Sequence, residues 1–141
     1  MALKINLKPG EKFVVNGAVI SNGDKRASLV VQNKVTLLRE KDILQQKDAN
    51  TPAKRIYFAV MMLYLDEAGR RDYYDEFVLR MSEYMSAIKN PEQITVCLAV
   101  SQLVMDQAYY KALMHTKKLL QYEAERLADG ASGISENTED G

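Results

Sequence analysis

The sequence predicts an α+β fold, with a small N-terminal module of five antiparallel strands followed by a C-terminal bundle of three or four helices. Apolar residues alternate with polar ones, or form short runs between turn residues, up to about residue 44. From Ala49 onward they recur at three- and four-residue steps, which is typical of helices. The chain has 141 residues, is 47% hydrophobic and 27% charged, and is therefore large enough to fold around a core without disulfide staples.

Turn residues divide the N-terminal part into five short strands. Pro9-Gly10, Asn16-Gly17 and Asn22-Gly23 are turn dipeptides, because their residues preset φ or tolerate positive φ. Strands this short cannot bury a face alone, so we expect a compact antiparallel sheet or a small barrel. The expected strands cover residues 3–8, 13–15, 18–20, 28–32 and 35–38.

Helix start signals organise the remainder of the chain. Thr51 is a predicted N-cap with Pro52 at the first helical position, and Asn90-Pro91 repeats the signal with Gln93 completing a capping box. Gly69 is expected to end the first helix as its C′ residue. Whether the last two helices are continuous near Gln107 is left open. The predicted organisation is a basic β module at 1–48, a helical region at 49–128, and a disordered acidic tail at 129–141.

Several classes of function lack the residues that they require. No signal peptide or membrane-length apolar run is visible, so we expect a cytoplasmic protein that does not contact the membrane. His115 is the only histidine and Cys97 the only cysteine, and no phosphate-binding glycine loop is present. We therefore predict that the protein is not an enzyme and carries no cofactor or metal.

The formal charge of zero is a sum of two opposed halves. Residues 1–55 hold eleven basic and five acidic side chains, a balance of +6, whereas residues 56–141 carry −6. Such asymmetry points to an anionic partner for the basic half, although attraction between the halves is an equal alternative. All eight tyrosines lie at residue 57 or later, so a base-stacking platform on the β module is not expected. RNA bound there would meet Lys and Arg at its phosphates, and backbone and side-chain groups at its base edges.

Six stretches resemble the flagellar biosynthesis repressor FlbT family of alphaproteobacteria. They are Leu-Lys-Pro-Gly-Glu-Lys (7–12), Asn-Gly-Ala-Val-Ile (16–20), Leu-Arg-Glu-Lys-Asp-Ile (38–43), Ala-Asn-Thr-Pro-Ala-Lys-Arg-Ile-Tyr-Phe-Ala-Val-Met-Met (49–62), Tyr-Tyr-Lys-Ala-Leu-Met (109–114) and Tyr-Glu-Ala-Glu-Arg-Leu (122–127). The resemblance spans residues 3–127. It implies a post-transcriptional regulator that binds the 5′ untranslated region of flagellin mRNA and represses translation or promotes decay. Some relatives act as activators, so the sign of regulation is not carried over.

A fainter resemblance links the N-terminal part to the carbon storage regulator family, a small five-stranded RNA-binding dimer. The order Leu3-x-Ile5, then Gly10-Glu11, and finally Leu38-Arg39-Glu40 is similar to that family, whose first and last strands form the RNA edge. Arg39 matches its principal arginine, whereas Leu38 replaces its histidine. Lys8 matches a basic residue, whereas Leu7 stands where that family has another arginine. This resemblance implies a homodimer.

The leading hypothesis is an RNA-binding regulator whose partner is the flagellin mRNA leader, with no role for DNA. Arg39 would pair bidentately with a guanine edge or a phosphate, whereas the lysines would act as point charges. The candidate RNA-binding residues are Lys4, Lys8, Lys12, Lys25, Arg26, Arg39 and Lys41.

The rival hypothesis is a protein-interaction adaptor that acts on mRNA only indirectly. Its Met- and Tyr-rich helices would hold flagellin or a companion flagellar regulator. In the first helix, four apolar residues supply more apolar surface than one helix face needs, with a helical-bundle core as the alternative use: Phe58, Met61, Met62 and Leu65.

Overall fold

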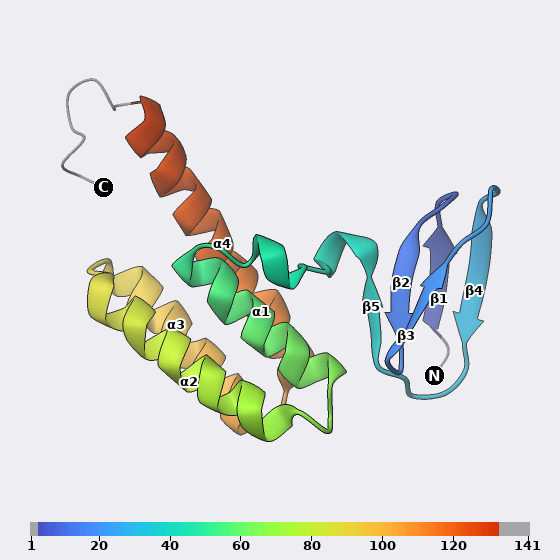
Figure 1. Cartoon of the computed structure of the whole chain (residues 1–141), viewed down its shortest axis with the longest axis horizontal. Helices are drawn as coiled ribbons and strands as arrows, with labels where there is room; N and C mark the ends of the chain where they lie inside the picture. Colours follow the sequence, from blue (N-terminus) through green and yellow to red (C-terminus); the bar gives the residue numbers. More distant parts are fainter. Residues whose placement is uncertain (1–2, 133–141) are drawn as a thin grey trace. The chain divides into compact units, whose positions relative to one another are not determined.

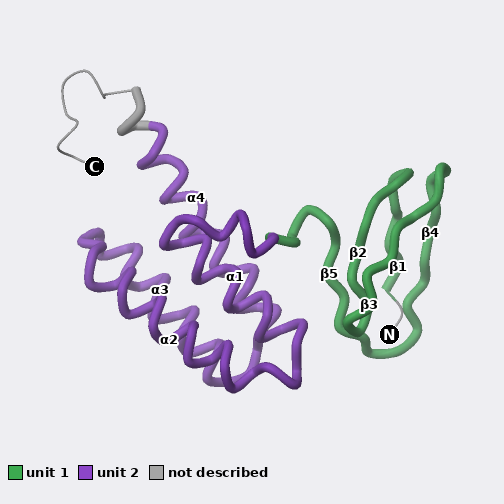
Figure 2. Tube along the Cα trace, viewed as in Figure 1, with its two compact units in different colours: residues 1–44 green, residues 45–141 purple. Residues whose placement is uncertain are grey.

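The computed structural model describes residues 3–132, and side chains as far as residue 128. Five strands precede four helices, which confirms the predicted α+β class (Figure 1). The chain divides into two compact units, residues 1–44 and 45–141, coloured green and purple in Figure 2. The predicted tail begins at 129, where the backbone is still helical, and its part at 133–141 lies outside the described residues.

The five strands of the β unit form two antiparallel sheets rather than one. Strand β1 (Leu3–Leu7) pairs with β4 (Ala27–Val31), while β2 (Lys12–Val15) lies between β3 (Ala18–Ser21) and β5 (Leu37–Arg39). Asn16 and Gly17, both at positive φ, make the predicted tight turn between β2 and β3. The consecutive strands β3 and β4 belong to different sheets, so neither a single sheet nor a closed barrel forms.

A small core joins the two sheets. Ile5 and Leu7 from β1 and Phe13 from β2 are its buried centre, at 5%, 3% and 4% exposure. Directly opposite residues of an antiparallel pair point to the same face, so Leu29 shares the face of Ile5, and Ile20 that of Phe13. Apolar side chains thus meet between the sheets. Partly buried residues complete this core: Val15, Val31 and Leu37.

The helical unit contains four separate helices. They are α1 (Pro52–Leu65), α2 (Arg70–Ala87), α3 (Pro91–Met105) and α4 (Tyr109–Ser132). Helix α1 packs on α2 and α4, and α3 packs on α4. The open question about the last two helices is answered by a break in which Gln107 takes a φ of 61°. The helical hydrogen-bond pattern of α3 stops at this break, and α4 starts after it.

The predicted helix starts form, with differences in detail. The Thr51 hydroxyl accepts from Lys54 N–H, and the Asn90 side chain accepts from Glu92 N–H at 2.8 Å. The reciprocal half of the predicted capping box is absent, because the buried Oε1 of Gln93 has no hydrogen-bond partner. Gly69 does not end α1; it is the N-cap of α2 at a φ of −94°. A Cβ at Gly69 would lie 2.7 Å from the Asp66 carboxylate, which accepts the Gly69 N–H, so a larger residue there would require that side chain to move.

Candidate nucleic-acid interface

Two loops at one end of the β unit are tied together by hydrogen bonds. The side-chain amide of Asn22 donates to the carbonyl of Lys8 at 2.8 Å and to that of Lys25 at 2.9 Å. Backbone bonds from Gly10 N–H to Gly23 O and from Asn22 N–H to Glu11 O, both 2.8 Å, repeat the connection. The loops 8–11 and 22–26 therefore form one rigid end of the unit.

This end carries three exposed basic side chains, Lys8, Lys25 and Arg26, which we call the basic loop cluster. Because Asn22 binds the backbone of both loops, it holds Lys8 and Lys25 at a common surface without using their ammonium groups. Arg26 follows Lys25 directly, just before β4. A rigid surface of point charges is suited to binding successive phosphates.

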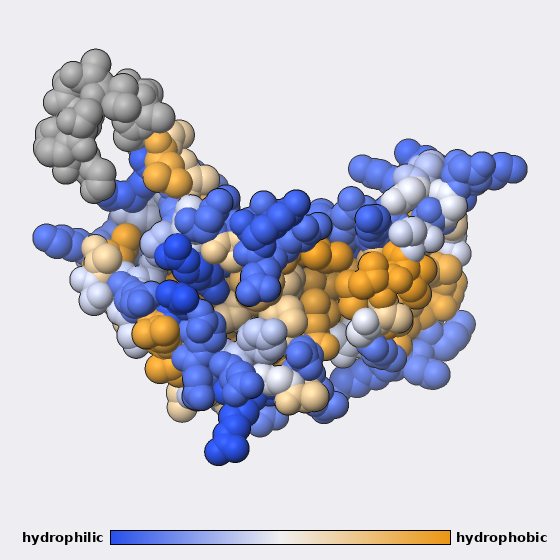
Figure 3. Space-filling view, viewed as in Figure 1, coloured by the Kyte–Doolittle hydropathy of each residue, from blue (hydrophilic) through white to orange (hydrophobic). Residues whose placement is uncertain are grey.

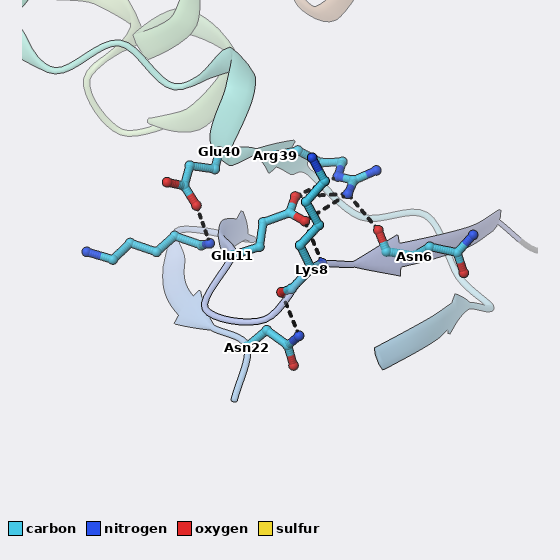
Figure 4. A network of polar contacts seen from close by, with 7 residues as sticks. Asn6, Lys8, Glu11, Asn22, Arg39 and Glu40 are labelled. Atoms are coloured by element: carbon cyan, nitrogen blue, oxygen red, sulfur yellow. Dashed lines mark hydrogen bonds and ion pairs between the residues drawn. The ribbon is translucent and has the colours of Figure 1, made fainter. Parts of the chain in front are cut away.

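Arg39 lies at the same end of β2 but is engaged within the protein (Figure 4). Its Nε and Nη2 donate to the two carboxylate oxygens of Glu11 at 3.0 Å each, and Nη2 also donates to the carbonyl of Asn6 at 2.6 Å. The side chains of Arg39 and Glu11 are 32% and 11% exposed. The fork that sequence reasoning assigned to RNA thus binds β1 and the 8–11 loop.

Glu11 is the centre of this network. Its carboxylate also accepts the N–H of Lys8 at 3.0 Å. That backbone hydrogen bond first, and the bonds and charge of Arg39 after it, hold the pKa of Glu11 below its ordinary value against the opposing effect of desolvation. The ionised carboxylate therefore connects the first loop to the last strand.

The remaining predicted residues lie around this end or along the strands. Lys12 begins β2 with its side chain exposed, while its N–H donates to Glu40 at 2.7 Å. Lys4 is exposed on β1, opposite Val30, on the face that points away from the core. Lys41 is exposed in the 3-10 turn Glu40–Asp42 that follows β5. Lys4 and Lys41 lie outside the network of Figure 4.

A comparison with known protein families finds a family whose sequence model matches most of this chain. The sequence model of the family described as Flagellar protein FlbT matches residues 3–127. The chain belongs to the FlbT family. No solved structure matches it.

Relatives in the FlbT family carry names that describe repression. The Flagellum biosynthesis repressor protein FlbT of Caulobacter vibrioides (strain ATCC 19089) is 55% identical over 135 residues, 96% of each chain. The Probable flagellum biosynthesis repressor protein FlbT of Caulobacter sp. (strain K31) is 57% identical over 127 residues, 90% of this chain and 97% of that one. The Probable flagellum biosynthesis repressor protein FlbT 1 of Bradyrhizobium diazoefficiens is 36% identical over 124 residues, 87% of this chain and 83% of that one. These names describe repressors rather than enzymes.

The single cysteine and the single histidine of this FlbT-family chain both have shifted pKa values. Cys97 is buried on α3, and burial raises the pKa of its thiol to about 11, so it is protonated near neutrality. Burial and the nearby Lys118 lower the pKa of His115. Among residues 3–132 no three His, Cys, Asp or Glu side chains are grouped as a metal site would require. The helices within that range are too short or too polar to cross a membrane.

Sequence reasoning overlooked the residues that assemble the site. The sequence pattern indicates only a turn at Asn22-Gly23 and does not assign a role to the Glu11 side chain. Of the four apolar residues singled out on α1, Met61 is buried at 3% exposure, whereas Phe58, Met62 and Leu65 are half-buried. The most exposed large apolar residues of the helical unit lie on α2, α3 and α4: Tyr74, Val78, Leu79, Leu98, Met105, Tyr110 and Leu127. The sequence signal for this site was Asn22, because an Asn side-chain amide can donate hydrogen bonds to two carbonyl groups.

Proposed function

We propose that this chain is a post-transcriptional repressor of flagellin expression that acts in the cytoplasm. Its β unit binds the 5′ untranslated region of flagellin mRNA and thereby blocks translation or promotes decay. The names of its relatives support repression of flagellum biosynthesis. The observation that supports RNA binding is the basic loop cluster on two loops that Asn22 ties together.

The role proposed for each side chain depends on whether its charged group already binds another part of the protein. Lys8, Lys25 and Arg26 bind phosphates, because their charged groups are exposed. Lys4, Lys12 and Lys41 extend the contact along the strands and the turn after β5. Arg39 acts as a positioning residue through Glu11, rather than as the direct contact with a guanine edge or a phosphate that the sequence predicted.

The test is binding of the purified full chain to a flagellin leader RNA. Lys8→Ala and Lys25→Ala should each weaken binding by up to ~1 kcal/mol, roughly fivefold, since each removes one partly screened charge pair. Asn22→Ala removes no charge, yet it should weaken binding by a similar factor because Lys8 and Lys25 lose their common support. Filter binding at one fixed salt concentration measures all three.

Lys34→Ala is the matched control, because it removes the same charge from the same unit. Its loop is tied to the opposite end of β2, where Asn16 and Thr36 exchange hydrogen bonds of 2.8 and 2.9 Å. Binding by this variant should equal that of the wild type. Equal losses in Lys34→Ala and Lys8→Ala would contradict the assigned site.

The adaptor function is the second candidate, and exposed apolar side chains on α2 and α3 favour it. Leu98 and Met105 on α3 are 57% and 66% exposed. Such residues are suited to holding a flagellin or a companion regulator. If the leader RNA binds only when a second flagellar protein is added, the adaptor function replaces direct RNA binding.

A further inference from the structure

Helix α3 has the composition of a buried helix. Among its 15 residues, Pro91–Met105, only Glu92 is charged, whereas α2 and α4 carry seven charged residues each. The helix most similar to it is α1, which has two charged residues and packs on both α2 and α4. A helix without a charged face is normally enclosed by other elements. We therefore expect α3 to be covered on more than one side.

Within this chain, α3 packs closely on one neighbour only. Its contact with α4 is extensive, whereas its contact with α2 is slight. The buried residues Cys97, Val100 and Val104 recur at steps of three and four and form one face of the helix. Leu98 and Met105, two turns apart, are 57% and 66% exposed. The chain itself thus leaves apolar surface of α3 uncovered.

The uncovered surface has the spacing of a helix-packing stripe. Ile94, Leu98, Ser101 and Met105 are separated by four, three and four residues, which places them along one line on α3. We call these four residues the α3 stripe; Ile94 and Ser101 are half-buried. Figure 3 shows apolar patches of the helical unit bordered by hydrophilic surface. A heptad spacing of this kind allows a second helix to pack along the first.

The surroundings of the α3 stripe are acidic. Residues 66–106, which comprise α2, α3 and their adjoining turns, contain eight acidic and four basic side chains. One of the four, Arg80, is bound by the carboxylates of Glu76 and Glu83, while Asp75 is exposed. A second copy of the chain would carry the same acidic excess, and like charges across an interface oppose association. The charge therefore favours a basic partner.

We infer that the α3 stripe binds a basic amphipathic helix of another protein. That helix carries apolar residues at heptad spacing, which contact Leu98 and Met105, and lysine or arginine residues on both sides of them. Its basic residues face the carboxylates of α2 and of the adjoining turns. The inference rests on the adaptor function, whose partner it specifies, and does not depend on RNA binding by the β unit.

Model peptides test the chemistry of the partner. The first has 15 residues, the length of α3, with leucine at the heptad positions and lysine on both sides of them. The second has glutamate in place of every lysine. Fluorescence anisotropy of the labelled peptides with the purified full chain should show binding of the lysine peptide. Binding of the glutamate peptide should be at least about tenfold weaker, because its charges repel those of the chain.

Variants of the chain test the position of the site. Leu98→Ser/Met105→Ser should weaken binding of the lysine peptide by about tenfold, because it removes the two most exposed apolar contacts of α3. Asp75→Asn should weaken it by up to about fivefold, since it removes one exposed carboxylate. Leu127→Ser, at a 59% exposed position on α4, is the matched control and should bind as the wild type does. Circular dichroism verifies the fold of each variant.

Four results would overturn the inference. The first three are equal peptide binding by Leu98→Ser/Met105→Ser and the wild type, equal binding of the two peptides by the wild type, and a tenfold loss in Leu127→Ser. The fourth is a second copy on the α3 stripe, which sedimentation equilibrium would reveal as a wild type of twice 16.0 kDa and a Leu98→Ser/Met105→Ser variant of 16.0 kDa. Peptide binding is measured without RNA, so its absence overturns this inference whether or not the chain binds the leader RNA.

Discussion

The Arg39–Glu11 pair decides how the first loop of the chain is held. Two hydrogen bonds of 3.0 Å join the guanidinium to both carboxylate oxygens, and Lys8 N–H binds the same carboxylate. A guanidinium fork engaged in this way fixes the geometry of the loop that carries Lys8. Substitution of Arg39 is therefore expected to act on the proposed RNA binding through the loop.

Glu11 should make stability depend on pH in the acid range. Because its pKa is lowered in the folded state, the stabilisation is complete above the ordinary value of 4.5 and is lost as pH falls through the lowered value. Glu11→Gln should lower the urea midpoint near neutrality, and the difference from wild type should disappear at low pH. Asp24→Asn, which removes an exposed carboxylate of the same unit outside this hydrogen-bond network, is the matched control. A wild-type and Glu11→Gln difference that is constant across pH would contradict this account.

At the scale of elements, α4 completes the start of α1. The Thr51 hydroxyl donates to the Glu123 carboxylate, which also accepts the N–H of Ala53 at 3.0 Å. A carboxylate at a helix N-terminus satisfies a free N–H and interacts favourably with the helix dipole. Helix α1 is thus capped both by its own Thr51 and by a residue 72 positions from Thr51 along the chain.

Removal of this tertiary cap should destabilise the helical unit measurably. Thr51→Ala should cost about 1 kcal/mol as a lost N-cap, and Glu123→Ala about 1–2 kcal/mol as a lost charged acceptor. The double variant should cost less than the two single losses together, since both remove the same contact. Urea unfolding followed by circular dichroism measures these values. Glu125→Ala, exposed on the same helix, is the control, and strict additivity would show that Thr51 and Glu123 act independently.

At the scale of the whole molecule, the neutral net charge conceals a division that follows the two units. Residues 1–44 contain eight basic and four acidic side chains, and the acidic excess lies in the remainder. Three of the basic residues form the basic loop cluster. Affinity for a polyanion depends on the charges at the contact surface rather than on the sum over the chain.

The salt dependence of RNA binding should therefore reflect the charges at the contact surface rather than the net charge of the chain. Binding through the basic loop cluster alone predicts a slope of log K against log salt of roughly −2, and binding that also uses Lys4, Lys12 and Lys41 a slope of roughly −4, at ~0.7 per phosphate for single strands. Filter binding across a salt series measures the slope for the leader RNA. A slope near zero, as net charge would suggest, contradicts a phosphate-binding β unit.

Short-range patterns made most of the fold predictable. The turn at Asn16-Gly17, the caps at Thr51 and Asn90 and the change of period near Ala49 all depend on residues close in sequence. The strands could be predicted individually, but their division into two sheets could not, since alternation does not specify partners. For the same reason, the sequence did not predict that β3 is exposed.

The sequence by itself determined the α+β class, the unequal distribution of charge and membership of the FlbT family. Only the tertiary structure decided that Arg39 binds Glu11, 28 positions away, and that Asn22 joins two loops. Both outcomes depend on contacts between residues far apart in the chain, where local propensity carries no information. From the sequence, a basic residue is a candidate ligand-binding residue whether or not another side chain binds it. Whether its charged group is available to a ligand depends on which carboxylate the fold places beside it.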